Sequence, residues 1–291
     1  MAENTASTDN GDPRMNVAFQ GQFGAYSHLA CQEGLPAYTP LPCRTFEDAF
    51  AAVSEGRAGR AMIPIENSLA GRVADIHHLI PTSDQYIVGE HFQAVNHQLM
   101  APHGAKLEDI REVHSHIHAL PQCRKLIREL GIEPVVHADT AGAAAEISEL
   151  GDISQAAIAS QLAGEVYGLK SLKANIEDAE HNTTRFLVFA RKAVKPKRNG
   201  EPLITSFVFR VRNVPAALYK AMGGFATNGV NMTKLESYMV GGDFQASQFF
   251  ADIEGDPRDR NVQLALEELE FFSREVRVFG TYPAHPFRRK G

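Results

Sequence analysis

The chain has few cysteines, which limits the chemistry that thiols can supply. Its 291 residues include three, Cys31, Cys43 and Cys123, and no CxxC pair. An odd number of cysteines without such a pair fits reduced thiols better than a disulfide framework. Cys31 and Cys123 lie in segments of helical pattern, where we expect them to pack rather than to catalyse.

Long apolar runs and basic stripes are also absent. No apolar run approaches the roughly 20 residues that span a bilayer. Residues 1–14 are polar and lack the apolar segment of a secretory signal, so we expect a disordered N-terminal arm. Asp and Glu number 35 against 29 Lys and Arg, a net charge of -6. These absences predict a cytoplasmic protein that binds neither a membrane nor nucleic acid.

A linker divides the chain into two parts. Residues 192–203 combine four charged cations, two prolines and a glycine, and we place the boundary there. Beyond it, residues 204–282 alternate between strand and helix patterns in the order βαββαβ, which is the ferredoxin-like split βαβ arrangement. Residues 283–291 form a C-terminal tail. Such a sheet leaves an edge or face for a partner, so we expect a homodimer or homotetramer.

The larger part, residues 15–191, alternates short strands and helices. This alternation predicts an α/β fold with mostly parallel sheets. Several predicted strands end in polar loops, which fits two lobes with a cleft between them. We expect the chain to cross between the lobes near residues 92–96 and again near 178–183.

Four polar loops follow predicted strands, where α/β sheets bind ligands. Residues 20–27 (QGQFGAYS) form either an anion-binding loop or a tight strand–helix turn. Residues 64–71 (PIENSLAG) carry an acid, an amide and a hydroxyl, and Asn67 or Ser68 could instead cap a helix. In residues 139–144 (DTAGAA), helix capping by Thr140 is the simpler interpretation.

The fourth loop, residues 114–123 (HSHIHALPQC), has three alternating histidines. A helix start there would splay them and no fourth ligand is evident, so we expect no metal site. Ser115 and Gln122 are better read as ligand contacts. A fifth segment, residues 182–186 (NTTRF), places two hydroxyls and a guanidinium before an apolar strand-like run. This segment fits protonation of a leaving oxygen on an anion, although it could simply open a buried strand.

Together, these five motifs resemble the prephenate dehydratase family in order and spacing, over about residues 16–190. The βαββαβ tail lies where that family carries its ACT regulatory domain. The resemblance implies a catalytic domain with two lobes like those of type II periplasmic binding proteins. It also implies conversion of prephenate to phenylpyruvate in phenylalanine biosynthesis, by loss of carbon dioxide and hydroxide without a cofactor.

The resemblance assigns roles to particular residues. Thr184 would donate a proton or hydrogen bond to the leaving oxygen, and Glu66 would assist it. Arg185 would bind a carboxylate, although a structural salt bridge is the alternative. The remaining expected substrate contacts are Ser27, Asn67, Ser68, Ser115, Gln122 and Thr140.

The resemblance further implies that L-phenylalanine binds the C-terminal domain as an effector. The expected contacts lie in two segments: Asn213, Pro215, Ala216, Ala217 and Leu218, then Glu236 and Ser237. Ala216 stands where the family commonly has glycine, and Tyr238-Met239 where it has Arg-Pro. A loop that requires a positive φ would tolerate Ala216 poorly, so another aromatic effector or an altered response remains open.

Two alternatives remain. The same loops would serve arogenate, the transaminated relative of prephenate. Two lobes and an effector domain also describe a non-catalytic sensor of aromatic ligands, although a sensor has little need for a hydroxyl beside a guanidinium.

Overall fold

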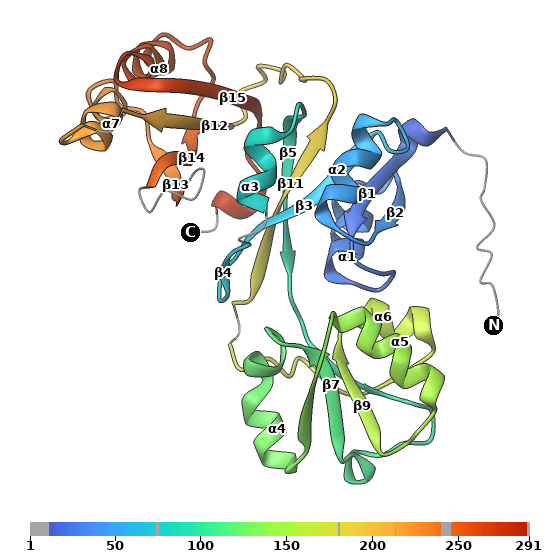
Figure 1. The fold of residues 1–291 in the computed structure, drawn as a ribbon. Coiled ribbons are helices and arrows are strands. Elements are labelled where there is room, and N and C mark those ends of the chain that lie inside the picture. The colour runs from blue at the N-terminus through green and yellow to red at the C-terminus, as the bar shows by residue number, and fades with distance from the viewer. Residues whose placement is uncertain (1–11, 74–75, 180, 213, 240–245, 290–291) are drawn as a thin grey trace.

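The computed structural model describes residues 12–73, 76–179, 181–212, 214–239 and 246–289. It contains three sheets, each with its own helices, which makes the protein a mixed α/β structure (Figure 1). Short 3₁₀ turns lie at Pro13–Met15, Leu107–Asp109, Leu120–Cys123 and Pro286–Arg289. Within the described residues, no helix is long and apolar enough to cross a membrane.

The first lobe is built on a sheet of strand order β2-β1-β3-β11-β5, with β4 paired to β3. Its strands are β1 (Asn16–Gln20), β2 (Thr39–Cys43), β3 (Arg60–Asn67), β4 (Gly71–Arg72), β5 (Tyr86–Ala94) and β11 (Thr183–Ala190). Its helices are α1 (Tyr26–Gly34), α2 (Phe46–Ser54) and α3 (Ile76–Thr82). Helix α2 begins where the Thr45 side chain accepts a hydrogen bond from the Asp48 amide, and it buries Phe50 and Val53 on the sheet.

The second lobe has the strand order β10-β6-β9-β7-β8. Its strands are β6 (Gln98–Ala101), β7 (Glu112–His116), β8 (Glu133–His137), β9 (Gln155–Ala159) and β10 (Lys170–Ala174). Its helices are α4 (Arg124–Leu130), α5 (Thr140–Leu150) and α6 (Gln161–Tyr167). The chain enters this lobe between β5 and β6 and returns to the first lobe between β10 and β11.

The expectation of mostly parallel sheets is wrong. Strand β1 pairs in parallel with β2 and β3, and β7 pairs in parallel with β8 and β9. The strands on either side of the two crossings, β5, β11, β6 and β10, pair antiparallel with their neighbours. Strands β6 and β11 directly follow the connections between lobes, with no helical crossover before them of the kind that keeps neighbouring strands parallel.

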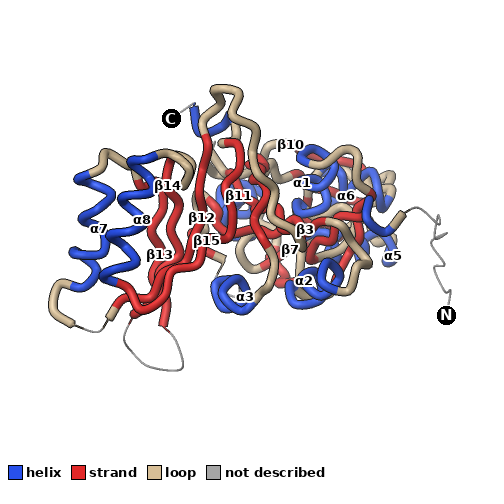
Figure 2. The backbone as a smooth tube through the Cα atoms, turned by 90° about the horizontal axis from the view of Figure 1, so that it is seen from above, coloured by secondary structure: helices blue, strands red, loops and turns tan. Residues whose placement is uncertain are grey.

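The C-terminal domain has the order β12 (Leu203–Val211), α7 (Ala217–Thr227), β13 (Met232–Met239), β14 (Ala246–Glu254), α8 (Arg260–Phe272) and β15 (Ser273–Pro283). Its antiparallel sheet has the order β13-β14-β12-β15. The hairpin turn expected at residues 241–243 lies outside the described residues. Seen from above in Figure 2, α7 and α8 form an outer layer, the sheet a middle layer and the first lobe the next.

The inner face of the C-terminal sheet packs directly on the first lobe. One apolar cluster joins Phe250, Phe279 and Tyr282 to Ile76 and Ile87 of the first lobe. The other face of the same sheet packs against α7 and α8 in a separate cluster. Because both faces are covered, an additional partner would have to pair with a strand edge, and β13 and β15 are the two edge strands of the described sheet.

Candidate functional site

The first element of the site is a hydrogen bond between Thr184 and Asn67. These residues are directly paired on the antiparallel strands β11 and β3. Asn67 Nδ2 donates to Thr184 Oγ1 at 2.9 Å. Asn67 Oδ1 accepts from the backbone amides of Leu69 and Ala70 at 2.9 and 2.8 Å, which fixes the orientation of the side-chain amide. Thr184 is therefore held as an acceptor from Asn67, with its own hydroxyl proton left to donate.

A chain of amides extends this pair across the two crossings between lobes. Asn67 Nδ2 also donates to Asn182 Oδ1 at 2.7 Å, and Asn182 Nδ2 donates to Gln122 Oε1 at 2.7 Å. The same Gln122 oxygen lies 3.0 Å from His97 Nε2. The network thus links the predicted residues Asn67, Gln122 and Thr184 to residues that the sequence did not single out.

His97 and Tyr26 complete this network on the far side. Tyr26 OH lies 2.9 Å from His97 Nδ1 and 2.8 Å from the Asn96 carbonyl oxygen, two acceptors that share its single proton. Burial lowers the pKa of His97, although its hydrogen bond to Gln122 opposes this effect. A neutral ring that donates from Nε2 to Gln122 then offers Nδ1 as an acceptor. The His97 ring thus orients the side-chain amide of Gln122, and the amides of Gln122, Asn182 and Asn67 lie between this ring and Thr184.

Glu66 and Arg185 do not lie beside the Thr184 hydroxyl. They are the next directly paired residues on β3 and β11, and successive strand residues point to opposite faces. Arg185 Nη1 pairs with Glu66 at 3.0 Å and with Asp252 of the C-terminal domain at 2.6 Å. Arg185 Nη2 lies 2.9 Å from Glu90. Arg185, which was expected to bind a substrate carboxylate, thus has carboxylate partners within the protein, and Glu66, which was expected to assist Thr184, lies on the opposite face of its strand.

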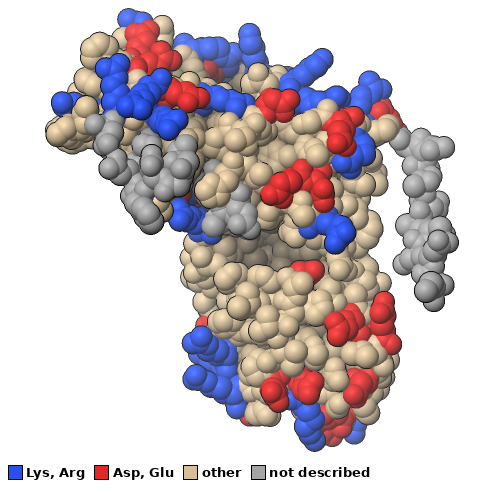
Figure 3. Space-filling view, in the orientation of Figure 1, with Lys and Arg blue, Asp and Glu red and all other residues tan. Residues whose placement is uncertain are grey.

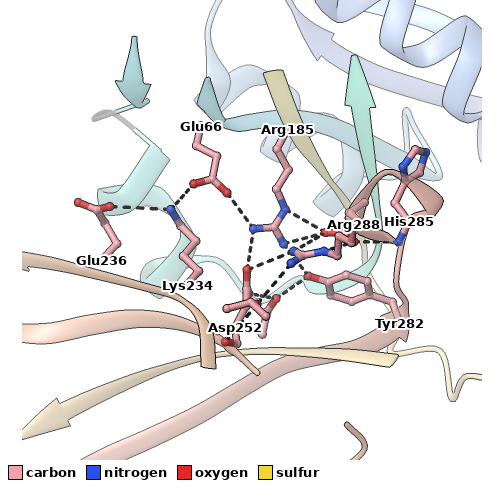
Figure 4. Close-up of polar contacts among 11 residues, drawn as sticks. Glu66, Arg185, Lys234, Glu236, Asp252, Tyr282, His285 and Arg288 are labelled. Atoms are coloured by element: carbon pink, nitrogen blue, oxygen red, sulfur yellow. Dashed lines mark hydrogen bonds and ion pairs between the residues drawn. The ribbon is translucent and has the colours of Figure 1, made fainter. Parts of the chain in front are cut away.

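Figure 4 shows this second cluster on the face of the strands turned toward the C-terminal domain. Lys234 of β13 binds Glu66 at 2.6 Å, and Arg288 of the C-terminal segment binds Glu90 at 2.7 Å. Burial would raise the pKa of Glu66, but Lys234 and Arg185 outweigh it and lower that pKa. Burial likewise opposes the charge of Arg185, and the carboxylates around it, Asp252 first, raise its pKa well above the usual value. This cluster is a set of paired charges that joins two domains.

Two of the expected hydroxyl contacts, Ser115 and Ser68, have structural partners, and the expected helix cap at Thr140 is wrong. Ser115 is fully buried, and its hydroxyl donates to the Ile158 carbonyl at 2.6 Å. This hydroxyl therefore forms a hydrogen bond in the core rather than a ligand contact. Ser68 Oγ donates to the His181 carbonyl and accepts from the Thr183 amide, which ties the two strands together just before Thr184. Thr140 does not cap α5, because Asp139 does so by accepting from the Gly142 amide.

A cavity of about 630 Å³ lies between the lobes beside the glycine-rich loop. Its lining includes Gln20, Gln22 and Arg44 of the first lobe and Asp139 and Tyr167 of the second; Thr184 does not line it. Arg44 is exposed and forms no ion pair or hydrogen bond with any residue that the structure describes. Ser27 lies half-buried in the first turn of α1, just beyond this loop.

The glycine-rich loop also binds the second lobe directly. Tyr167 OH donates to the Phe23 carbonyl at 2.9 Å, and Ser160 Oγ donates to the Gly24 carbonyl at 2.6 Å. A side chain on Gly24 would meet Ala163 of α6 at 2.7 Å, and the φ of +89° also favours glycine. Figure 3 shows the surface hollowed between the lobes, with charges of both signs on this face.

The expected effector segments lie on the C-terminal domain. Ala216 has φ +60° at the start of α7, so the loop does require the backbone conformation that favours glycine. Pro215 is exposed, Ala217 is buried and Leu218 is half-buried, whereas Asn213 lies outside the described residues. Glu236 and the Ser237 carbonyl both contact Arg72 of β4, so this second segment faces the first lobe.

The thiols are buried, and the described histidines are not gathered with other possible metal ligands. All three cysteines are free and buried, and burial raises the pKa of the Cys31 and Cys123 thiols. In the part of the chain that the structure describes, no three His, Cys, Asp or Glu side chains gather as a metal site requires.

Comparison with known proteins gives the family. The family model for prephenate dehydratase matches residues 17–194. A bifunctional N-acyl-homoserine lactone acylase/prephenate dehydratase from Komagataeibacter europaeus is 53% identical, over 94% of this chain and 98% of the relative. Arogenate dehydratase/prephenate dehydratase 2 from Arabidopsis thaliana is 39% identical, over 96% of this chain and 75% of the relative.

A solved structure supports the same relationship. Prephenate dehydratase from Arthrobacter aurescens, in complex with L-Phe, superposes with a TM-score of 0.84 at 30% identity, over 92% of this chain and 90% of that one. Residues 17–194, which the family model matches, contain the Asn67–Thr184 pair, both crossings between lobes and the glycine-rich loop beside the cavity. By sequence and by structure, this chain belongs to the prephenate dehydratase family.

Proposed function

We propose that the protein converts prephenate to phenylpyruvate. The substrate loses its ring carboxylate as carbon dioxide; the electrons of that bond make the ring aromatic and expel the ring hydroxyl, which takes up a proton and leaves as water. The ring itself supplies the driving force, so the enzyme must bind a dianion and provide one proton. The observation that carries this proposal is the Thr184 hydroxyl, which accepts from Asn67 and keeps its own proton.

Asn67 makes Thr184 a better donor than an ordinary threonine. As Thr184 gives its proton to the leaving oxygen, negative charge develops on Oγ1, and the hydrogen bond from Asn67 Nδ2 strengthens. The Asn67 orientation is already fixed by Leu69 and Ala70, so little reorganisation accompanies the step. Positioned proton donation of this kind contributes ~10²–10⁴ in rate.

The test is a set of variants at the pair. Thr184→Val keeps the shape and removes the hydroxyl, so kcat should fall by ~10²–10⁴. Thr184→Ser should retain most activity, and Asn67→Asp should lose it because Thr184 then faces an acceptor. Thr183→Val is the matched control one residue earlier. Full activity of Thr184→Val would remove the catalytic role and favour a non-catalytic sensor.

We propose Arg44, in place of Arg185, as the cation for a substrate carboxylate. Arg185 is occupied by three carboxylates, whereas Arg44 lines the cavity between the lobes without a described partner. Arg44→Ala should raise KM for prephenate with a smaller change in kcat. Arg57→Ala, at an exposed arginine just beyond α2 that pairs with Glu55, is the control. Equal KM values for the two variants would reject the assignment.

Arogenate is the alternative substrate, since the Arabidopsis relative is named for both dehydratase activities. Arogenate carries an ammonium group where prephenate carries a ketone, and Asp139 is the acid that lines the cavity. Comparing kcat/KM for both substrates decides between them, and Asp139→Asn should lower the preference for arogenate if that acid binds the ammonium group.

A second candidate activity is hydrolysis of N-acyl homoserine lactones, because the Komagataeibacter relative is named as an acylase as well. Such an amide hydrolase needs a nucleophile, and the buried thiols with raised pKa values are poorly suited to the task. Assaying amide cleavage with wild type and with Thr184→Val tests whether Thr184 serves both reactions. Cleavage that survives in Thr184→Val would place the acylase site elsewhere.

We also propose that L-phenylalanine binds the ACT-like C-terminal domain, as the Arthrobacter structure was solved with L-Phe. The contacts would come from the start of α7 and from β13, and two chains would pair along the β13 edge. Calorimetric titration with L-phenylalanine and L-tyrosine tests the effector. Sedimentation at micromolar concentration tests the pairing, and a monomer would contradict it.

A further inference from the structure

Two neighbouring residue pairs on β3 and β11 serve opposite faces of the first sheet. Asn67 and Thr184 form one pair, and Glu66 and Arg185 form the next. The first pair carries the reactive hydroxyl, and the second contacts the C-terminal domain (Figure 4). Because the pairs share the same short backbone segments, a displacement of Glu66 and Arg185 displaces Asn67 and Thr184 as well.

The C-terminal sheet presents a matching pair. Lys234 of β13 and Asp252 of β14 are themselves directly paired across their strands. Lys234 Nζ binds Glu66 Oε2 at 2.6 Å, and Asp252 Oδ2 binds Arg185 Nη1 at 2.6 Å. A cationic and an anionic residue on one sheet thus meet an anionic and a cationic residue on the other.

The matching pair is held firmly on its own side. The Asp252 side chain has no solvent exposure, and its second oxygen accepts from Ser206 Oγ. Ser206 in turn lies 2.6 Å from Tyr282 OH, which accepts from Arg185 Nη2 at 3.2 Å. The guanidinium of Arg185 is therefore fixed by two groups of the C-terminal domain.

The first sheet is irregular at the same point. Pairing shifts between Arg185 and Phe186, which face Glu66 and Pro64, so Ile65 is an extra residue on β3. Such bulges interrupt the regular ladder and redirect side chains, and they occur beside active sites. Side-chain contacts from the C-terminal domain consequently contribute more to the placement of Asn67 and Thr184 than they would beside a regular ladder.

Strand β13 also binds the adjoining part of the first lobe. Arg72 of β4 is directly paired with Glu66, and it contacts Glu236 and the Ser237 carbonyl of β13. Glu236 and Ser237 belong to the segment proposed to receive the effector. A movement of β13 would therefore reach β3, which carries Asn67, and β4, which pairs with it.

We propose that Lys234 and Asp252 are positioning residues for the dehydratase reaction, acting on Asn67 and Thr184 through Glu66 and Arg185. The proposal rests on the dehydratase function proposed above. It assigns the C-terminal domain a part in basal catalysis and a route by which a ligand on β13 alters the reactive hydroxyl.

The test uses Lys234→Met and Asp252→Asn in the full chain. Both should lower kcat by ~10- to 100-fold, as small misplacements of reacting groups do, while KM changes little. Lys234→Arg keeps the positive charge and should therefore retain most of the wild-type kcat. Lys220→Met, at an exposed residue of α7, and Asp259→Asn, at a half-buried residue that pairs with Arg198 away from the first lobe, are controls expected to match wild type.

A docking reporter separates positioning from simple loss of the interface. The chain has no tryptophan, and Phe287 stacks on Phe92 with ring centroids 4.8 Å apart, so Phe287→Trp adds a single fluorescent probe where the C-terminal segment docks. The fall in kcat should occur with the reporter signal unchanged. Unchanged kcat in both variants, or a fall found only when the reporter shows undocking, would overturn the proposal.

Amide hydrogen exchange gives a second readout that does not depend on turnover. The Ser68 amide donates to the Thr183 carbonyl, and the Thr183 amide donates to Ser68 Oγ. Lys234→Met and Asp252→Asn should speed exchange at residues 68 and 183, whereas the controls should not. If wild type does not turn over prephenate, the proposed function fails, and faster exchange in the variants alone would still support the coupling.

Discussion

Gly280 offers a direct way to separate the C-terminal domain from the first lobe. It lies on β15, where that strand passes against β5, and a Cβ there would overlap the Ile87 carbonyl oxygen and lie 3.0 Å from the carbonyl carbon. Both groups are main chain, so no side-chain rotation relieves the overlap. We predict that Gly280→Ala forces β15 away from β5.

The size of the effect follows from the geometry. A carbon and a carbonyl oxygen rest at about 3.3–3.6 Å, so the strands must move apart by roughly 1 Å or more. Overpacking of this kind costs about 1–3 kcal/mol, and main-chain overlap places Gly280→Ala toward the upper end. The cluster that contains Phe279, Tyr282 and Ile87 would lose packing at the same time. We expect Tm to fall by roughly 5–10 °C.

The assay is thermal unfolding followed by circular dichroism, together with limited proteolysis of the linker at residues 192–203. Gly89→Ala is a control on β5, because its Cβ would lie 3.8 Å from the nearest Val188 atoms, an ordinary contact. Gly280→Ala should melt earlier and be cut faster than this control. Identical melting and cleavage of the two variants would refute the reasoning about the contact of β15 with β5.

Four further predictions concern single sites. Arg185→Met leaves three carboxylates with one cation fewer and should lower the free energy of unfolding by about 3–5 kcal/mol in urea denaturation, with Arg185→Lys intermediate; no loss would show that the cluster is dispensable. The pKa of Glu66 is lowered in the folded protein, so its stabilisation is present above the usual value of 4.5 and is lost as pH falls through the folded pKa; Glu66→Gln should flatten the stability-against-pH curve below that value, and an unchanged slope would contradict this. Ala216→Gly should raise the free energy of unfolding by about 0.5–1 kcal/mol by relieving the φ of +60°, whereas a loss would mean that backbone entropy outweighs strain. Ser115→Ala leaves the buried Ile158 carbonyl without its partner and should cost about 1–3 kcal/mol without raising KM for prephenate; a raised KM would restore Ser115 to the substrate site.

The sequence predicted much of the secondary structure because the patterns there are local. The βαββαβ order appears with its elements close to the expected places, since alternation in strands and helical spacing are read within a few residues. Strand β2 was missed, because its sequence TPLPC carries two prolines that argue against a strand. Strand β2 lies at the edge of the sheet, where a missing amide is tolerated, and Arg44 follows directly from it.

Such local patterns do not predict whether paired strands run parallel or antiparallel, or which side chains become partners. Parallel pairing was inferred from alternating strands and helices, but the crossings between lobes bring strands together from positions far apart in the chain. Ser115 looked like a ligand contact because it stands in a polar loop motif, yet its partner Ile158 is 43 residues away. Tyr26 and His97 join the network across 71 residues, and no spacing rule links them.

The separation of Thr184 from Arg185, in contrast, follows from the strand that they share. The motif was expected just before an apolar strand-like run, with the opening of a buried strand as the alternative, but β11 begins at Thr183. Adjacent residues of a strand point to opposite faces, so this hydroxyl and this guanidinium face different surroundings. Side chains alternate in the same way on β3, so Glu66 and Asn67 point to opposite faces of the sheet. Asn67 shares a face with Thr184, and Glu66 with Arg185, because these residues are directly paired across the two strands. A motif on a strand therefore describes two surfaces, and here one holds the reactive hydroxyl while the other binds the C-terminal domain. The coupling proposed between the C-terminal domain and the Thr184 hydroxyl therefore spans a single residue step of the same backbone.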